Sequence, residues 1–310
     1  MKLKDLFEHA QTVQGSRVHD NGNGKPFTMV GRDIVRSVID LNGSQLDKLQ
    51  AGDGSFYRLP TGTPAVENYK IDAAIIEQSL VAKAGAEVII FKDPSKAIAT
   101  GVTGDLVMSS IPAYFQTVEA APFALVADGA SVGVTPLPIS RGAINIDAAS
   151  GPQTNTGIYG LRFEFSRATL KSYPSIEAAI MHAIVAGLAR TADAVLLNAI
   201  VAATPAAFSL AAAAALSVRM GELRAIVGTA AHGAAIDQNG VLRAAGISAE
   251  LTAEIATTVV GTFNRSAIMI RSDVDVLAER TNLDGSLAVT AWAAFQPLLP
   301  DTSRFWTVAA

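Results

Sequence analysis

The chain has 310 residues, of which half are hydrophobic and only 17% are charged. A globular domain usually has about 25% charged residues, so a monomer would have little charge for its surface, and extensive burial against other subunits is favoured. The net charge of −4 and the absence of cysteine exclude a basic surface for nucleic-acid phosphates, disulfides, and thiolate chemistry.

The first third of the chain gives mixed signals. Residues 1–5 contain no apolar stretch of a signal peptide, and we expect a soluble protein. The apolar spacing over 34–39 predicts a short helix, that over 71–80 predicts a second helix, and 88–91 predict a strand. Residues 1–104 lack the heptads expected of a coiled-coil scaffolding segment. Their role is not predicted: this region could be an arm, an inserted domain or a built-in scaffold.

Alternation of apolar and polar residues predicts a two-stranded β-arm over 135–166. One strand contains Ile144 and Ile146, a polar tip follows at 150–157, and the returning strand carries its large apolar residues on one face. An isolated two-stranded arm is marginally stable in water, so a partner surface is expected. Burying a phenylalanine ring there contributes about 1.5–3 kcal/mol. The residues expected at a subunit interface are Arg141, Ile144, Ile146, Arg162, Phe163, Glu164, Phe165 and Arg167.

A long amphipathic helix is the strongest prediction from the sequence. Ser175 is a suitable N-cap, and apolar residues repeat at helical spacing through residue 199, with His182, Arg190 and Asp193 largely off the apolar stripe. The uncharged run 194–218 is long enough to span a bilayer. Because it contains Pro205, we expect instead a buried helix, a break, and a second alanine-rich helix.

The last third is predicted to be rich in strands. Residues 223–227 predict a buried strand, 237–240 a turn, and 248–255 a helix capped by Ser248. A β-meander is expected from three further apolar runs, at 267–271, 274–279 and 287–293, with a turn at 282–285.

Catalytic, cofactor and metal sites are not predicted. The segment Gly129 to Gly133 matches the G-x-S-x-G nucleophile motif around Ser131, but that motif needs a following helix, which Pro136 and Pro138 disfavour. A glycine-rich loop is the preferred interpretation. The four histidines, His9, His19, His182 and His232, lack the spacing of metal ligands. Asp273 and Asp275 share a strand face, which is typical of a solvated strand edge.

Three stretches resemble the Hong Kong 97-type major capsid protein of tailed bacteriophages. Residues 165–180 resemble the junction between the extended loop and the spine helix, 188–196 the far end of that helix, and 260–268 the strand entry after the axial domain. The resemblance implies an α+β fold with an N-terminal arm at 105–134, an extended β-hairpin loop at 135–166 and a spine helix at 167–205. It further implies an axial domain at 206–257 and closing strands of a peripheral domain at 258–310.

The resemblance implies a structural role and no enzymatic one. Such a protein self-assembles as a homo-oligomer, in hexamers and pentamers, into an icosahedral shell around double-stranded DNA. A portal and scaffolding or decoration proteins are implied partners, and assembly in the host cytoplasm and a place in the virion are implied. Some members of this family cross-link through a loop lysine, and here no lysine lies between Lys96 and Lys171. An encapsulin-like compartment and a serine hydrolase using Ser131 stay open as alternatives.

Overall fold

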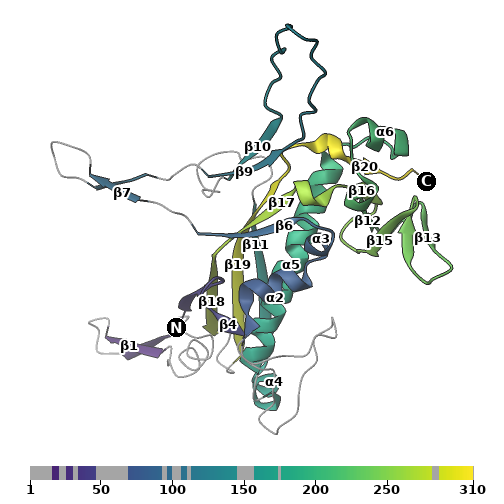
Figure 1. Ribbon diagram of the computed structural model, residues 1–310. Coiled ribbons are helices and arrows are strands. Elements are labelled where there is room, and N and C mark those ends of the chain that lie inside the picture. Colours follow the sequence, from purple (N-terminus) through teal and green to yellow (C-terminus); the bar gives the residue numbers. More distant parts are fainter. Residues whose placement is uncertain are drawn as a thin grey trace.

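The structure is a computed structural model that describes residues 16–20, 26–30, 34–46, 69–92, 96–99, 106–109, 113–144, 157–173, 176–280 and 286–309. It has a mixed α+β architecture, with one long helix beside a narrow sheet, a second sheet with its own core, and a projecting arm (Figure 1). Ile146, Ser175, the polar tip at 150–156 and the turn at 282–285 lie outside the described residues.

The main sheet is built around β19 (Leu287–Leu298). Phe295 of β19 is paired both with β11 (Gly157–Phe165) and with β17 (Ala267–Arg271), so these two strands flank β19 on opposite sides. After Ser272 the chain continues as β18 (Asp273–Arg280) along the rest of β19. β6 (Glu87–Phe91) lies parallel to β17, and β3 (Ile34–Asp40) lies antiparallel to β18. The strands predicted at 88–91 and in the C-terminal meander are therefore confirmed.

The helix predicted over 34–39 is wrong, because these residues form β3. Ile39 is 7% exposed and its neighbour Val38 is 52% exposed, the alternation of a strand with one buried face. Pairing with β18 decides the structure here, since a short apolar run does not distinguish helix from strand. Residues 34–40 and 87–91 thus belong to the main sheet, although the role of residues 1–104 was left open by the sequence.

Helix α5 (Ile176–Ala202) packs on this sheet as the predicted long helix. Its buried residues, among them Leu196 and Leu197, join the main core. By length and composition α5 is apolar enough to cross a membrane, but 56% of its most apolar window is buried against its own subunit. α2 (Ile71–Gln78) and α3 (Leu80–Lys83) contact α5. The chain then breaks before α6 (Leu210–Ala215), which confirms the predicted two-helix reading of 194–218.

The second sheet has the order β13 (Ala234–Ile236), β14 (Leu242–Ala244), β15 (Ile247–Leu251), β12 (Arg224–Val227), β16 (Val259–Gly261) and β20 (Phe305–Thr307). The strand predicted at 223–227 and the turn at 237–240 are confirmed, the turn by a bond from the Gly240 N–H to the Asp237 carbonyl at 3.0 Å. The helix predicted at 248–255 is wrong. Its first half is β15, which pairs in parallel with β12 and buries Ile247 in the second core.

The arm is formed by β9 (Ala113–Val118) and β10 (Ile139–Ile144), which pair antiparallel. The hairpin predicted over 135–166 is therefore wrong in its pairing, because β10 pairs with β9 and β11 pairs with β19. Alternation identifies a strand, but it does not identify the partner. The remaining domain boundaries stay predictions.

Shorter elements complete the described chain. They are β1 (Ser16–Asp20), β2 (Pro26–Val30), β4 (Gln45–Leu46), β5 (Tyr69–Lys70), β7 (Lys96–Ala99), β8 (Leu106–Ser109), α4 (Arg167–Ser172), and the 3-10 turns η1 (Met220–Glu222), η2 (Phe263–Arg265) and η3 (Thr302–Arg304).

Candidate assembly surface

Residues 119–138, here called the arm tip, connect β9 to β10 and project from the subunit (Figure 1). Three of its large apolar side chains have almost no contact with their own chain: Phe123, Leu125 and Val134 are 105%, 102% and 101% exposed. The tip contains two acidic residues and no lysine or arginine. Large apolar side chains exposed together on one short segment favour a site of association.

The arm strands rest on the main sheet through a small apolar cluster. Phe115 of β9 and Ile144 of β10 pack against a buried set that includes Met269 and Leu298. The Gln296 side-chain amide also donates to the backbone carbonyl of Ala143 at 2.9 Å. The arm strands are therefore held to the main sheet.

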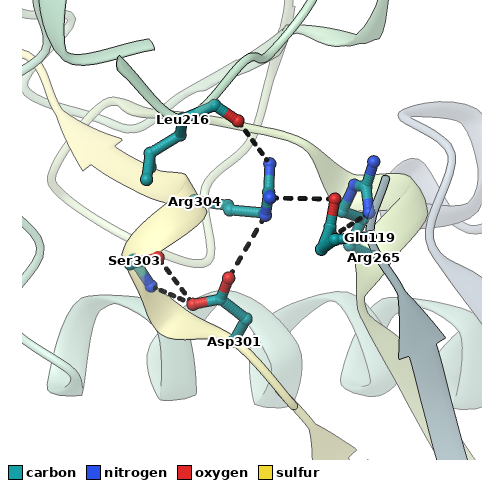
Figure 2. Close-up of polar contacts among 6 residues, drawn as sticks. All are labelled: Glu119, Leu216, Arg265, Asp301, Ser303 and Arg304. Carbon is teal, nitrogen blue, oxygen red and sulfur yellow. Dashed lines mark hydrogen bonds and ion pairs between the residues drawn. The ribbon is translucent and has the colours of Figure 1, made fainter. Parts of the chain in front are cut away.

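An ionic cluster lies where the tip leaves the strands (Figure 2). The Glu119 N–H donates to the Pro138 carbonyl at 2.8 Å, which closes the base of the tip. The Glu119 carboxylate contacts two guanidinium groups, that of Arg265 in η2 and that of Arg304 in η3, the latter at 2.9 Å. Arg304 is only 7% exposed, so this end of the cluster is shielded from water.

Arg304 also bonds to two groups outside the arm. Its Nε donates to Asp301 at 3.2 Å and its Nη1 to the Leu216 carbonyl, just after α6, at 3.3 Å. Burial alone would raise the pKa of Asp301, but hydrogen bonds from the Ser303 hydroxyl and N–H, together with Arg304, outweigh it, and the pKa is lowered. Asp301 is therefore held ionised beside Arg304.

The residues expected at an interface fall into two groups. Arg141 and Ile144 lie in the arm, where the Arg141 guanidinium lies 5.1 Å from the ring centre of Tyr114. Arg162, Phe163, Glu164 and Phe165 lie in β11 of the main sheet, Arg167 is exposed at the start of α4, and Ile146 lies outside the described residues. Phe163 and Phe165 pack against the main core, so the expectation that they lie on an arm without a core of its own is wrong.

Arg162 has its charge partners within its own subunit. It bonds to Glu279 at 2.7 Å and to Glu164 at 3.0 Å, and these hydrogen bonds, that to Glu279 first, raise the pKa of Arg162. The structure thus assigns Arg162 and Glu164 an intramolecular contact, and any role at a subunit interface stays a prediction.

Asp193 is a buried carboxylate that lies largely off the predicted apolar stripe of the long helix. It is 4% exposed on α5 and accepts hydrogen bonds from the Ser79 hydroxyl at 2.6 Å, the Leu80 N–H at 2.9 Å and the Val81 N–H at 3.0 Å. Burial raises its pKa, against the opposing effect of these three bonds. The carboxylate therefore attaches the start of α3 to the long helix.

Two hollows flank α5. An apolar one of about 130 Å³ lies between α5 and β11, and includes Leu161 and Trp292 in its lining. A larger one of about 480 Å³ lies between α5 and the end of β15, beside an ion pair of Arg190 with Glu254. Within the described residues no group of three or more metal-binding side chains is present.

Ser131 lacks the setting of a catalytic nucleophile. It is exposed in the arm tip, and no helix follows it among residues 119–138, so the strand-turn-helix that the G-x-S-x-G motif requires is missing there. His182 is buried on α5. Asp273 and Asp275 open β18, which is an inner strand of the main sheet and not the edge that was expected.

No protein-family model matches the chain, and no curated protein matches its sequence. Among solved structures, the chain is similar to the capsid of an empty GTA particle, with 14% identity, a TM-score of 0.46, and coverage of 74% of this chain and 89% of that one. It is similar to Gordonia phage Cozz, with 14% identity, a TM-score of 0.44, and coverage of 75% and 87%. It is also similar to the bacteriophage PhiM1 mature capsid, with 10% identity, a TM-score of 0.42, and coverage of 74% of this chain and 86% of that one.

Proposed function

We propose that this protein is the major capsid protein of a tailed bacteriophage. Its role is structural and not enzymatic: copies of the chain assemble into hexamers and pentamers of an icosahedral shell that encloses double-stranded DNA. The observation that carries the proposal is the arm tip, where Phe123, Leu125 and Val134 stand almost fully in solvent. Burial of these side chains on a neighbouring copy explains both the arm and the low charge of the chain.

The body behind the arm has the properties of a rigid tile. The long helix, the main sheet and the second sheet are joined through two packed cores. A tip contact that is weak in one pair of subunits becomes strong when it is repeated around a closed shell. The mildly acidic chain would leave packaged DNA without specific contacts. Portal, scaffolding and decoration proteins are proposed partners, with assembly in the host cytoplasm.

Electron microscopy of the protein expressed alone, with sizing by light scattering, tests this proposal. Closed shells or rings of five and six subunits are the expected result. A homogeneous monomer in the presence of candidate scaffolding proteins would contradict it. The encapsulin-like alternative predicts shells with protein cargo and no genome, so nucleic-acid content of particles purified from infected cells separates the two. A fluorophosphonate probe that labels Ser131 would instead support the hydrolase.

We predict that the mature shell is held together without covalent bonds between subunits. No lysine lies between Lys96 and Lys171, so the arm has no amine for an isopeptide bond, and the chain has no cysteine for disulfides. Boiling mature particles in detergent should release one band of monomer size on a denaturing gel. A ladder of covalent multimers would contradict the prediction.

A further inference from the structure

The tip and the two sheets meet at the Glu119 cluster, and the geometry there assigns a further role to one residue. We infer that Arg304 is a positioning residue that fixes the direction in which the arm tip leaves the subunit and ties that direction to the second sheet. The inference rests on the proposed function for its biological meaning, since it concerns the segment proposed to contact a neighbouring copy.

The first argument is the position of the two arginines in the chain. Arg265 ends η2, between β16 of the second sheet and β17 of the main sheet, and Arg304 immediately precedes β20 of the second sheet. The Thr262 N–H donates to the Arg304 carbonyl at 3.2 Å, which joins the two segments. Glu119 is therefore held at the junction between the sheets, and not by either sheet alone.

The second argument is that the Arg304 guanidinium contacts several segments at once. Its three nitrogens contact three separate segments: the base of the tip at Glu119, the η3 turn at Asp301, and the end of α6 at Leu216. Figure 2 shows the guanidinium between these groups. A planar guanidinium presents its donors in fixed directions, so a movement of α6 or η3 would change the geometry offered to Glu119.

The third argument is charge and burial. Glu119 and Asp301 balance Arg265 and Arg304, and the side chain of Arg304 is 8% exposed. Removing one partner from such a shielded set leaves a charge without compensation. The arm strands keep their own support, from Phe115, Ile144 and Gln296. Loss of Arg304 should therefore release the tip and leave the arm strands on the sheet.

Spin-label distance measurements test this inference directly. The chain has no cysteine, so Ala130→Cys in the tip and Glu250→Cys at an exposed position of β15 in the second sheet give one defined pair in the full-length protein, diluted with unlabelled protein. We expect the distance distribution to broaden about two-fold in Arg304→Gln and in Glu119→Gln. Arg243→Gln is the matched control, because it removes an arginine–carboxylate pair, with Asp237 at 2.7 Å, that does not touch the arm.

Unchanged distributions in the folded Arg304→Gln and Glu119→Gln variants would overturn the inference, as would equal broadening in Arg243→Gln. If Arg304→Gln does not fold, as judged by circular dichroism, Arg304→Lys decides, since it keeps the charge and loses the fixed donor directions of the guanidinium. Shell formation is scored separately by electron microscopy. A parent protein that forms no shell even with candidate scaffolding proteins would contradict the proposed function, while the distance measurement still decides the role of Arg304.

Discussion

Replacing both Phe123 and Leu125 with aspartate is expected to abolish shell assembly and to leave the subunit folded. Both side chains stand fully in solvent within one subunit, so their removal takes nothing from either core. In the assembled state each buried side chain of this size contributes about 1.5–3 kcal/mol, and each subunit loses that contribution at its tip contact. Size-exclusion chromatography and electron microscopy check the result.

Aspartate also adds charge, so the control must separate repulsion from loss of apolar contact. Ser131→Asp with Thr135→Asp places two carboxylates at exposed positions of the same tip and keeps every large apolar side chain. We expect this control to assemble at least in part. Particles of parental size and yield from the Phe123→Asp, Leu125→Asp variant would show that the tip is not an assembly contact.

Replacing Asp193 with alanine is expected to lower the free energy of unfolding of the unassembled subunit by about 3 kcal/mol. The change removes the acceptor of three donors, of which the Ser79 hydroxyl and the Val81 N–H are buried and the Leu80 N–H is partly buried. Urea denaturation followed by circular dichroism measures the loss. Asn198→Ala on the same helix is the control, because Asn198 is exposed, and its effect should stay within about 0.5 kcal/mol. A similar loss in both variants would contradict the role of Asp193.

The raised pKa of Asp193 gives this contribution a definite pH dependence. The folded subunit binds the Asp193 proton more tightly than the unfolded chain does, whose ordinary value is 3.8. The stabilising effect of that proton is complete below 3.8 and is lost as pH rises through the higher pKa of the folded state. The stability of the parent relative to Asp193→Asn should therefore fall as pH rises across this interval. If the difference in unfolding free energy between the parent and Asp193→Asn stayed constant or increased with pH, the raised pKa of Asp193 would be contradicted.

The elements with a long or strongly periodic pattern were predicted well from the sequence. The long helix was predicted from 175 to 199 and observed as α5 (Ile176–Ala202), and the C-terminal meander appears as β17, β18 and β19. The errors fall on short segments. Residues 34–39 and 248–255 were predicted to be helices. Instead, residues 34–39 pair with β18, and the first half of 248–255 pairs with β12, as strands. Such long-range pairing leaves no local signal in the sequence.

The candidate site was located less well, for two physical reasons. Alternation in 139–144 and 157–165 predicted strands correctly, but their partners β9 and β19 are set by the fold, so the arm was assigned to the wrong segment. The tip at 119–138 carries no regular pattern, and its importance follows from its exposure, which only the structure gives. Asp193 was predicted only to lie largely off the apolar stripe, and its burial could not be predicted because α3, which covers it, is placed there by long-range packing.

The pairing of β6 with β17 and of β3 with β18 has a consequence during synthesis of the protein. A ribosome releases the first strands and the arm tip long before β17, β18 and β19, which complete the main sheet. Such non-local pairings form slowly, because the intervening chain must close first. The apolar tip is therefore exposed on nascent chains that have no finished body, and exposed apolar surface on unfinished chains favours aggregation.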